Sequence, residues 1–101
     1  MKTKSKKVNI KDLKPEISSK LEIIEDACKH SNGIGYEMTI TSGKDGTHMK
    51  GSKHYSGNAI DIRTSDMMHI NATTSRIQSK LGDDYDVIFE KDHIHIEYDP
   101  E

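Results

Sequence analysis

The sequence predicts one small α+β domain with a mainly antiparallel sheet and two main helices. Two stretches repeat apolar residues at helical spacing, which indicates two amphipathic helices. Shorter runs rich in β-branched and aromatic residues indicate strands, and a tight turn separates the last two, as in a hairpin. The 101 residues, 32% of them hydrophobic, suffice for one domain with a modest core and are too few for two. We therefore assign residues 1–101 to a single domain.

The first 13 residues are expected to form a mobile arm or an edge strand. They contain one short mixed run, from Val8 to Ile10, and are locally basic, with Lys2, Lys4, Lys6, Lys7 and Lys11. A solvated arm explains such a lysine-rich start without any partner.

The first helix is expected to begin at Pro15, because proline fits the first helical position. An apolar stripe follows at spacings of four, three and four residues: Ile17, Leu21, Ile24 and Cys28. The sequence Ser31-Asn32-Gly33 predicts the end of this helix, since glycine and asparagine suit a left-handed cap.

After Gly33, the sequence pattern predicts four strands and a second helix. The strands are expected at residues 36–41, 58–63, 85–89 and 93–98. Ser65 is a suitable N-cap for the second helix, and Gly82 ends it after Leu81. Between the first two of these strands lies a polar loop, residues 47–57, that contains His48 and His54. A loop of this length in a small domain is usually functional or disordered, and its histidines favour a functional one.

Composition argues against several classes of protein. The net charge is −2 and the pI about 6.3, so we expect no general attraction to nucleic acid or to an anionic membrane. No stretch approaches the roughly 20 apolar residues of a membrane span. The basic start is not followed by the apolar segment of a signal peptide, so we expect none. We therefore expect synthesis in the cytoplasm and a monomeric protein. Cys28 is the only cysteine, which excludes an intramolecular disulfide.

A possible metal site stands out around Asp61, which lies between Ile60 and Ile62. A carboxylate in such an apolar run is costly to bury unless a partner neutralises it. On the last strand, alternation places His93, His95 and Glu97 on one face and Ile94, Ile96 and Tyr98 on the other. Pairing the polar faces of the two strands would bring Asp61 to His95, and the loop would then add His54.

Two histidines and one aspartate, with a fourth position open to water, form the pattern of a catalytic zinc site. Zinc lowers the pKa of a bound water to roughly 7 and polarises a carbonyl, although other divalent metals remain open. A base is still required beside that water. Asp92 lies three residues before His95 and is our candidate for this base.

These residues carry a resemblance to a known family. The stretch Ser52-x-His54-x-x-Gly57-x-Ala59-x-Asp61 resembles the SxHxxGxAxD signature of the M15 D-Ala-D-Ala peptidases, and Asp92-x-x-His95 is similar to their later acidic-x-x-His motif. His93-x-His95 also resembles the HxH shared with lysostaphin-type peptidases and hedgehog signalling domains. Thr41-Ser42-Gly43 matches a family stretch at the end of a strand. The likeness covers roughly residues 36–98.

The resemblance implies a hedgehog/DD-peptidase-like fold with zinc held by His54, Asp61 and His95 and with Asp92 as general base and acid. It implies cleavage of peptidoglycan stem peptides by a carboxypeptidase or an endopeptidase. Forms this small look most like those of bacteriophages or prophages, which include endolysins released by a holin and lysins carried on the virion. Ser52 is expected to orient the loop or a ligand, and Tyr55 to fix the loop or line a substrate groove.

One position departs from the family pattern. Asp45 stands where many members have an arginine that steadies the oxyanion. Lys44, His48 or His93 could take over this role; His93 is the first choice and His48 the second.

Two other functions remain as alternatives. One is a zinc module without catalysis that serves in binding or assembly. The other is nucleic-acid binding through the lysine-rich start, which the acidic balance disfavours.

Overall fold

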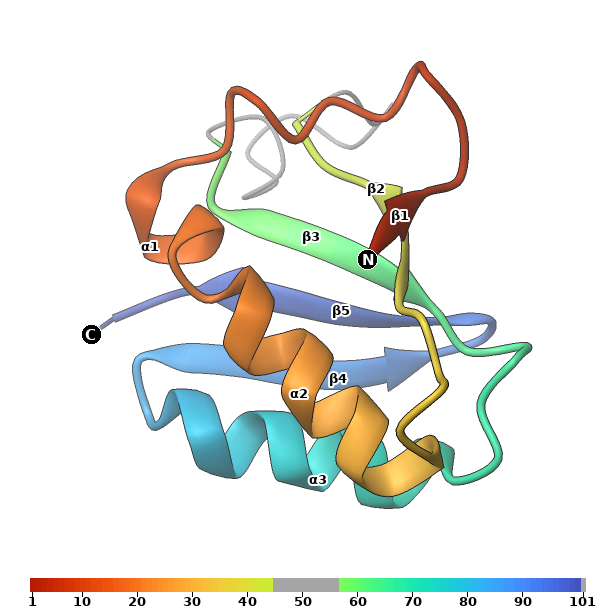
Figure 1. Cartoon of the computed structure of the whole chain (residues 1–101). Helices are drawn as coiled ribbons and strands as arrows, with labels where there is room; N and C mark the ends of the chain where they lie inside the picture. Colours follow the sequence, from red (N-terminus) through yellow and green to blue (C-terminus); the bar gives the residue numbers. More distant parts are fainter. Residues whose placement is uncertain (45–56, 101) are drawn as a thin grey trace.

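The computed structural model of the chain describes residues 1–44 and 57–100. Its centre is a five-stranded sheet (Figure 1). In spatial order the strands are β1 (Lys2–Thr3), β2 (Thr39–Ser42), β3 (Ala59–Arg63), β5 (His93–Tyr98) and β4 (Tyr85–Glu90). All neighbouring pairs are antiparallel except β1 and β2, which are parallel. The predicted α+β class, the mainly antiparallel sheet and the final hairpin of β4 and β5 are therefore confirmed.

Two main helices, α2 (Leu21–Asn32) and α3 (Ile70–Leu81), pack side by side over one face of the sheet (Figure 1). A short helix, α1 (Pro15–Ser18), precedes α2. The sequence predicts α1 and α2 as one helix, but the chain turns at Ser19 and Lys20. The Tyr85 hydroxyl of β4 donates a hydrogen bond of 2.7 Å to the Glu16 carbonyl, and this contact holds α1 against the sheet.

The second helix begins later than predicted. Its first residue is Ile70, so Ser65 is not its N-cap. The Asn32 side-chain oxygen at the end of α2 accepts hydrogen bonds from the backbone N–H groups of Met68 and His69, at 2.9 and 3.0 Å. These N–H groups precede the first turn, so Asn32 anchors the segment that leads into α3, and the N-cap residue His69 makes no side-chain cap bond.

Two residues of the N-terminal arm form an edge strand, β1. The N–H groups of Lys2 and Lys4 donate to the carbonyls of Met38 and Ile40, at 2.9 and 2.8 Å. The strand involves Lys2 and Thr3, and the apolar run at residues 8–10 lies outside it. This pairing fixes the position of Lys4 beside β2.

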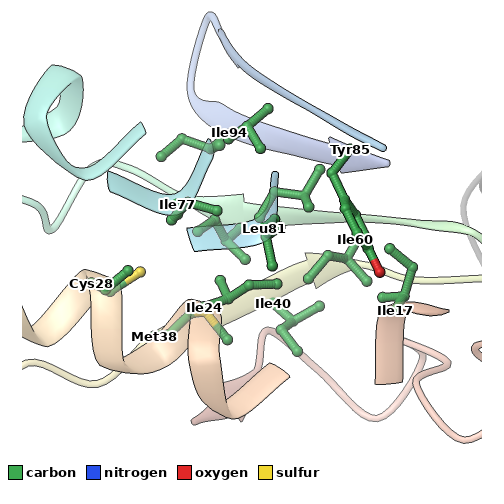
Figure 2. Packing of buried hydrophobic residues seen from close by; sticks show 14 of the residues in the cluster. Ile17, Ile24, Cys28, Met38, Ile40, Ile60, Ile77, Leu81, Tyr85 and Ile94 are labelled. Carbon is green, nitrogen blue, oxygen red and sulfur yellow. The ribbon is translucent and has the colours of Figure 1, made fainter. Parts of the chain in front are cut away.

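The core lies between the sheet and the two main helices (Figure 2). Side chains on one face of β3 and β5 are fully buried against residues of the helices; they are Ile60, Ile62, Ile94 and Ile96 from the strands and Ile24, Cys28 and Ile77 from the helices. Cys28 of the predicted apolar stripe is fully buried, and burial raises the pKa of its thiol to about 12, so the thiol stays protonated at neutral pH. None of the helices in the described ranges has the length and apolar character needed to cross a membrane.

Candidate metal and peptidase site

The candidate site is built on the sheet face opposite the helices. Asp61 of β3 and His95 of β5 are direct cross-strand partners, as the alternation of residues predicts. The Asp61 Oδ1 and His95 Nδ1 atoms lie 2.9 Å apart. The two side chains are largely buried, with 10% and 15% of their surfaces exposed. The buried carboxylate therefore has a partner that can neutralise it.

Glu97 contacts the other nitrogen of the His95 ring. Its Oε1 atom lies 2.7 Å from His95 Nε2. The hydrogen bond with Asp61, and after it the bond with Glu97, raise the pKa of His95 to about 9. At neutral pH the imidazole is thus doubly protonated and donates to both carboxylates. Two carboxylates fix the orientation of this ring.

His93 joins the buried pair to the turn between β4 and β5. Its Nδ1 atom lies 3.1 Å from Asp92 Oδ1, and its Nε2 atom lies 3.8 Å from Asp61 Oδ1 and 3.6 Å from Glu90 Oε1. The hydrogen bond with His93 is the main cause that lowers the pKa of Asp92. Asp92 is therefore ionised in the metal-free protein, and its lowered pKa makes it a weaker base than an ordinary aspartate.

Residues of the predicted signature hold the surroundings of Asp61 in place. The Thr41 hydroxyl donates a hydrogen bond of 3.4 Å to the Asp61 carbonyl, and Ser42 is the cross-strand partner of Asp61. Gly57 has a φ of 81°, and a Cβ atom at this position would lie 2.8 Å from the Asp12 carbonyl oxygen. The Gly57 carbonyl accepts a hydrogen bond of 2.9 Å from the Lys14 N–H. This glycine is thus required for a close backbone contact at the entry to β3.

Several predicted site residues lie outside the described residues: His48, Ser52, His54 and Tyr55. Lys44 is exposed, and its backbone N–H donates to the Asn9 carbonyl at 2.9 Å. No contact within the described part of the chain brings its side chain to Asp61 or His95, so the structure gives no support for Lys44 as the carbonyl-polarising group.

The donors around Asp61 fit a zinc ion. Two atoms bound to one tetrahedral zinc ion lie about 3.3 Å apart, so a small separation of Asp61 Oδ1 and His95 Nδ1 from 2.9 Å would suffice. A metal-binding histidine usually donates its other ring N–H to a carboxylate, and Glu97 accepts from His95 in this way. The pair supplies two donors, and the predicted third, His54, lies outside the described residues.

A second group of possible metal ligands lies beside the first. Within the described residues, one set of three acidic side chains brings its oxygens within 4.8 Å of one another: Asp86, Glu97 and Asp99. This set is compatible with a metal ion. Carboxylate oxygens alone suit calcium or magnesium better than zinc.

Two features of the site are not predicted from the sequence: Glu90 and the contact of Glu97 with the His95 ring. Alternation along β5 already places Glu97 on the face of His95, whereas Glu90 of β4 is brought opposite His93 only by the register of the hairpin. The alternation of Asp86, Ile88 and Glu90 along β4 was the available signal. It becomes informative only when the position of the turn at Lys91 and Asp92 is known.

Comparison with known proteins gives one partial similarity. The chain is 39% identical over 64 residues to the Sonic hedgehog protein of Danio rerio. The matched stretch includes 60% of this chain and only 15% of the length of that protein. No protein-family model matches the chain. The similarity therefore relates part of this domain to part of a hedgehog protein.

Proposed function

We propose that this protein is a zinc-dependent peptidase that hydrolyses the stem peptides of peptidoglycan, as a carboxypeptidase or an endopeptidase. The observation that carries the proposal is the carboxylate–imidazole–carboxylate arrangement of Asp61, His95 and Glu97. The SxHxxGxAxD signature supports it from the sequence. The partial similarity to a hedgehog protein supports a fold in which such a site occurs.

Asp61, His95 and His54 would hold the metal. Zinc, when bound, supplies a Lewis acid for the substrate carbonyl and for a water molecule. Glu97 keeps the His95 ring oriented, with Nε2 protonated and Nδ1 directed at Asp61. The fixed ring leaves little reorganisation when a ligand enters.

Asp92 is proposed to move the proton. Hydrolysis joins the water oxygen to the carbonyl carbon and breaks the C–N bond. The proton lost by water passes to Asp92 and then to the leaving amine. Asp92 is exposed, and its hydrogen bond to His93 Nδ1 holds it beside the site. A substrate that binds from the solvent can therefore contact this carboxylate. His93 Nε2 faces Asp61. From this position its N–H could stabilise the negative charge that develops on the carbonyl oxygen of the substrate.

The test compares two carboxylates that both contact His93. We expect the Asp92→Asn variant to retain zinc and to lose at least a hundredfold in kcat, the usual loss when a general base is removed. The Glu90→Gln variant is the matched control and should keep most of the activity. Mass spectrometry of digested peptidoglycan fragments reports both the rate and the bond cleaved.

Two results would count against this assignment. Loss of activity in Glu90→Gln but not in Asp92→Asn would transfer the base to Glu90. Wild-type protein that binds about one zinc ion per chain but leaves every stem-peptide bond intact would favour the second candidate, a zinc module without catalysis. The aspartate at position 45, in place of an arginine, is the observation that favours this alternative.

A further inference from the structure

A cavity of about 390 Å³ lies beside the candidate site, and the proposed chemistry assigns it no ligand. Among the residues that the structure describes, six line it: Lys4, Thr41, Arg63, Ser65, Asp92 and His93. Two of these, Asp92 and His93, belong to the proposed catalytic group. The cavity therefore adjoins two residues to which the proposed chemistry gives a role.

The sheet fixes both cations of this cavity. Arg63 is the cross-strand partner of His93 and follows Asp61 by two residues on the same strand, so both residues lie on the site face of β3. Lys4 follows β1, and its N–H donates to the Ile40 carbonyl at 2.8 Å. Two elements far apart in the sequence thus place positive charges at one end of the site.

These charges are not neutralised by neighbouring carboxylates in the described part of the chain. Neither Lys4 nor Arg63 has an acidic oxygen within 4.0 Å there. Of the described residues that line the cavity, only Asp92 carries a carboxylate, and it is hydrogen-bonded to His93 Nδ1 at 3.1 Å. The Thr41 and Ser65 side chains add hydroxyl groups to the lining. This combination is suited to an anion.

We propose that this cavity binds a carboxylate of the peptide substrate, with Arg63 as the main contact and Lys4 as the second. The inference rests on the proposed peptidase function and makes it more specific. The planar guanidinium can bind both oxygens of a carboxylate at once. The preferred substrate then carries a free carboxylate close to the scissile bond, either at the C-terminus or on an acidic side chain.

Binding to the zinc-free full-length protein tests the cavity separately from catalysis. The first pair of probes is N-acetyl-Lys-D-Ala-D-Ala and its C-terminal carboxamide. The second pair has blocked ends and differs only in D-glutamate against D-glutamine. NMR titration gives the affinity of each probe. The pair in which the acid binds better identifies the α-carboxylate or the side-chain carboxylate as the recognised group.

We expect the acid of one pair to bind about tenfold more tightly than its amide, the scale of a charge-assisted hydrogen bond. Arg63→Gln should remove most of this preference and leave the affinity of the amide unchanged. Arg76→Gln is the matched control, because it removes the same charge from α3, on the opposite side of the sheet. In the zinc-loaded protein, Arg63→Gln should raise KM for the acid with little change in kcat.

Three outcomes would overturn the inference: equal affinity for acid and amide, the same loss in Arg76→Gln as in Arg63→Gln, or a preference that appears only after zinc is added. If Arg63→Gln fails to fold, the variant Lys4→Gln, at an exposed residue, provides a second test. It should lower the affinity for the acid probe by a smaller factor than Arg63→Gln. A preference that depends on Arg63 without any hydrolysis would retain the cavity and reject the peptidase. Hydrolysis of stem peptides without a preference that depends on Arg63 would support the peptidase and reject the role of the cavity.

Discussion

At the scale of single residues, the site is organised by the need to bury Asp61. Its strand neighbours Ile60 and Ile62 point into the core, so the carboxylate is fixed on the other face of a strand that is buried on both sides. A charge in this position is tolerated only with a partner, and His95 provides it at 2.9 Å. The same two atoms that share a proton here are the ones we propose to share a metal ion.

The first prediction concerns the titration of His95 in the zinc-free protein. Its NMR midpoint should lie near pH 9, above the ordinary value of about 6.5. Because folding raises this pKa, the stabilisation is complete below about pH 6.5 and is lost as the pH rises through about 9. Thermal melts at several pH values should therefore show stability falling over this window.

The Glu97→Gln variant checks the cause of this shift. It removes one of the two carboxylates that favour the charged ring, so the midpoint of His95 should move down towards 6.5. A midpoint near 6.5 in the wild-type protein would contradict the arrangement. Zinc added at pH 8 should release protons, since the metal must displace the one on Nδ1.

The second prediction concerns Gly57, whose role is also local. Gly57→Ala should lower the free energy of unfolding by about 1–3 kcal/mol, because the residue has a positive φ and its new Cβ would press on the Asp12 carbonyl. Gly35→Ala is the matched control, since a Cβ at that position has no neighbour within 4 Å. Chemical denaturation measures both. An equal effect of the two substitutions would show that the close contact is unimportant.

At the scale of elements, the sequence predicts most of the strands and three helix boundaries: the start at Pro15 and the ends before Gly33 and Gly82. The β5 strand occurs at the expected residues, because its polar and apolar side chains alternate without exception from His93 to Tyr98. The end of α2 follows from Gly33, which has a φ of 107°. Local patterns of this kind are read directly from residue types.

Elements that depend on distant contacts could not be predicted in the same way. The start of α3 depends on Asn32, a residue 36 and 37 positions before the N–H groups that it binds. The break between α1 and α2 accompanies a contact from Tyr85. Glu90 reaches His93 only through the hairpin register. In each case the residue that makes the contact lies in another element. The local pattern of residue types around a helix or strand carries no information about such a distant residue.

The third prediction tests the joint between the two main helices. Asn32→Ala should lower the free energy of unfolding by about 1–3 kcal/mol. The substitution leaves the N–H groups of Met68 and His69 without their acceptor and removes a 2.9 Å bond to the Thr73 hydroxyl. Asn71→Ala, an exposed change on α3, is the control. Amide exchange should quicken first at Met68 and His69, and unchanged exchange there would argue against this joint.

At the scale of the whole molecule, the sheet separates a core face from a chemical face. The helices cover one side (Figure 1), and the other carries charge that changes sign along the strands. One end holds a group of acidic residues, Asp83, Asp84, Asp86 and Asp99, and the other holds two cations, Lys4 and Arg63, with one carboxylate, Asp92, among the described residues. Asp61 and His95 lie between these ends. A peptide with an amino and a carboxylate group would be oriented by this polarity before it reaches the candidate metal site.

The last prediction uses global stability to locate the metal. A metal that binds only the folded chain adds about 2.7 kcal/mol at a concentration a hundredfold above its Kd, so zinc should raise the melting temperature of the wild-type protein. The shift should vanish in Asp61→Asn, which removes a proposed ligand. It should persist in Asp86→Asn, which disrupts the acidic set of Asp86, Glu97 and Asp99.

Because Asp61→Asn also changes the stability of the metal-free protein, the comparison is between zinc-induced shifts within each variant. Calcium provides the complementary measurement, since it prefers the oxygen ligands of the acidic set. A zinc shift that survives in Asp61→Asn and disappears in Asp86→Asn would move the metal to the acidic set. In that position the metal would lie on the Glu97 side of the His95 ring, and the proposed peptidase chemistry between His95 Nδ1 and Asp61 would have no activating ion.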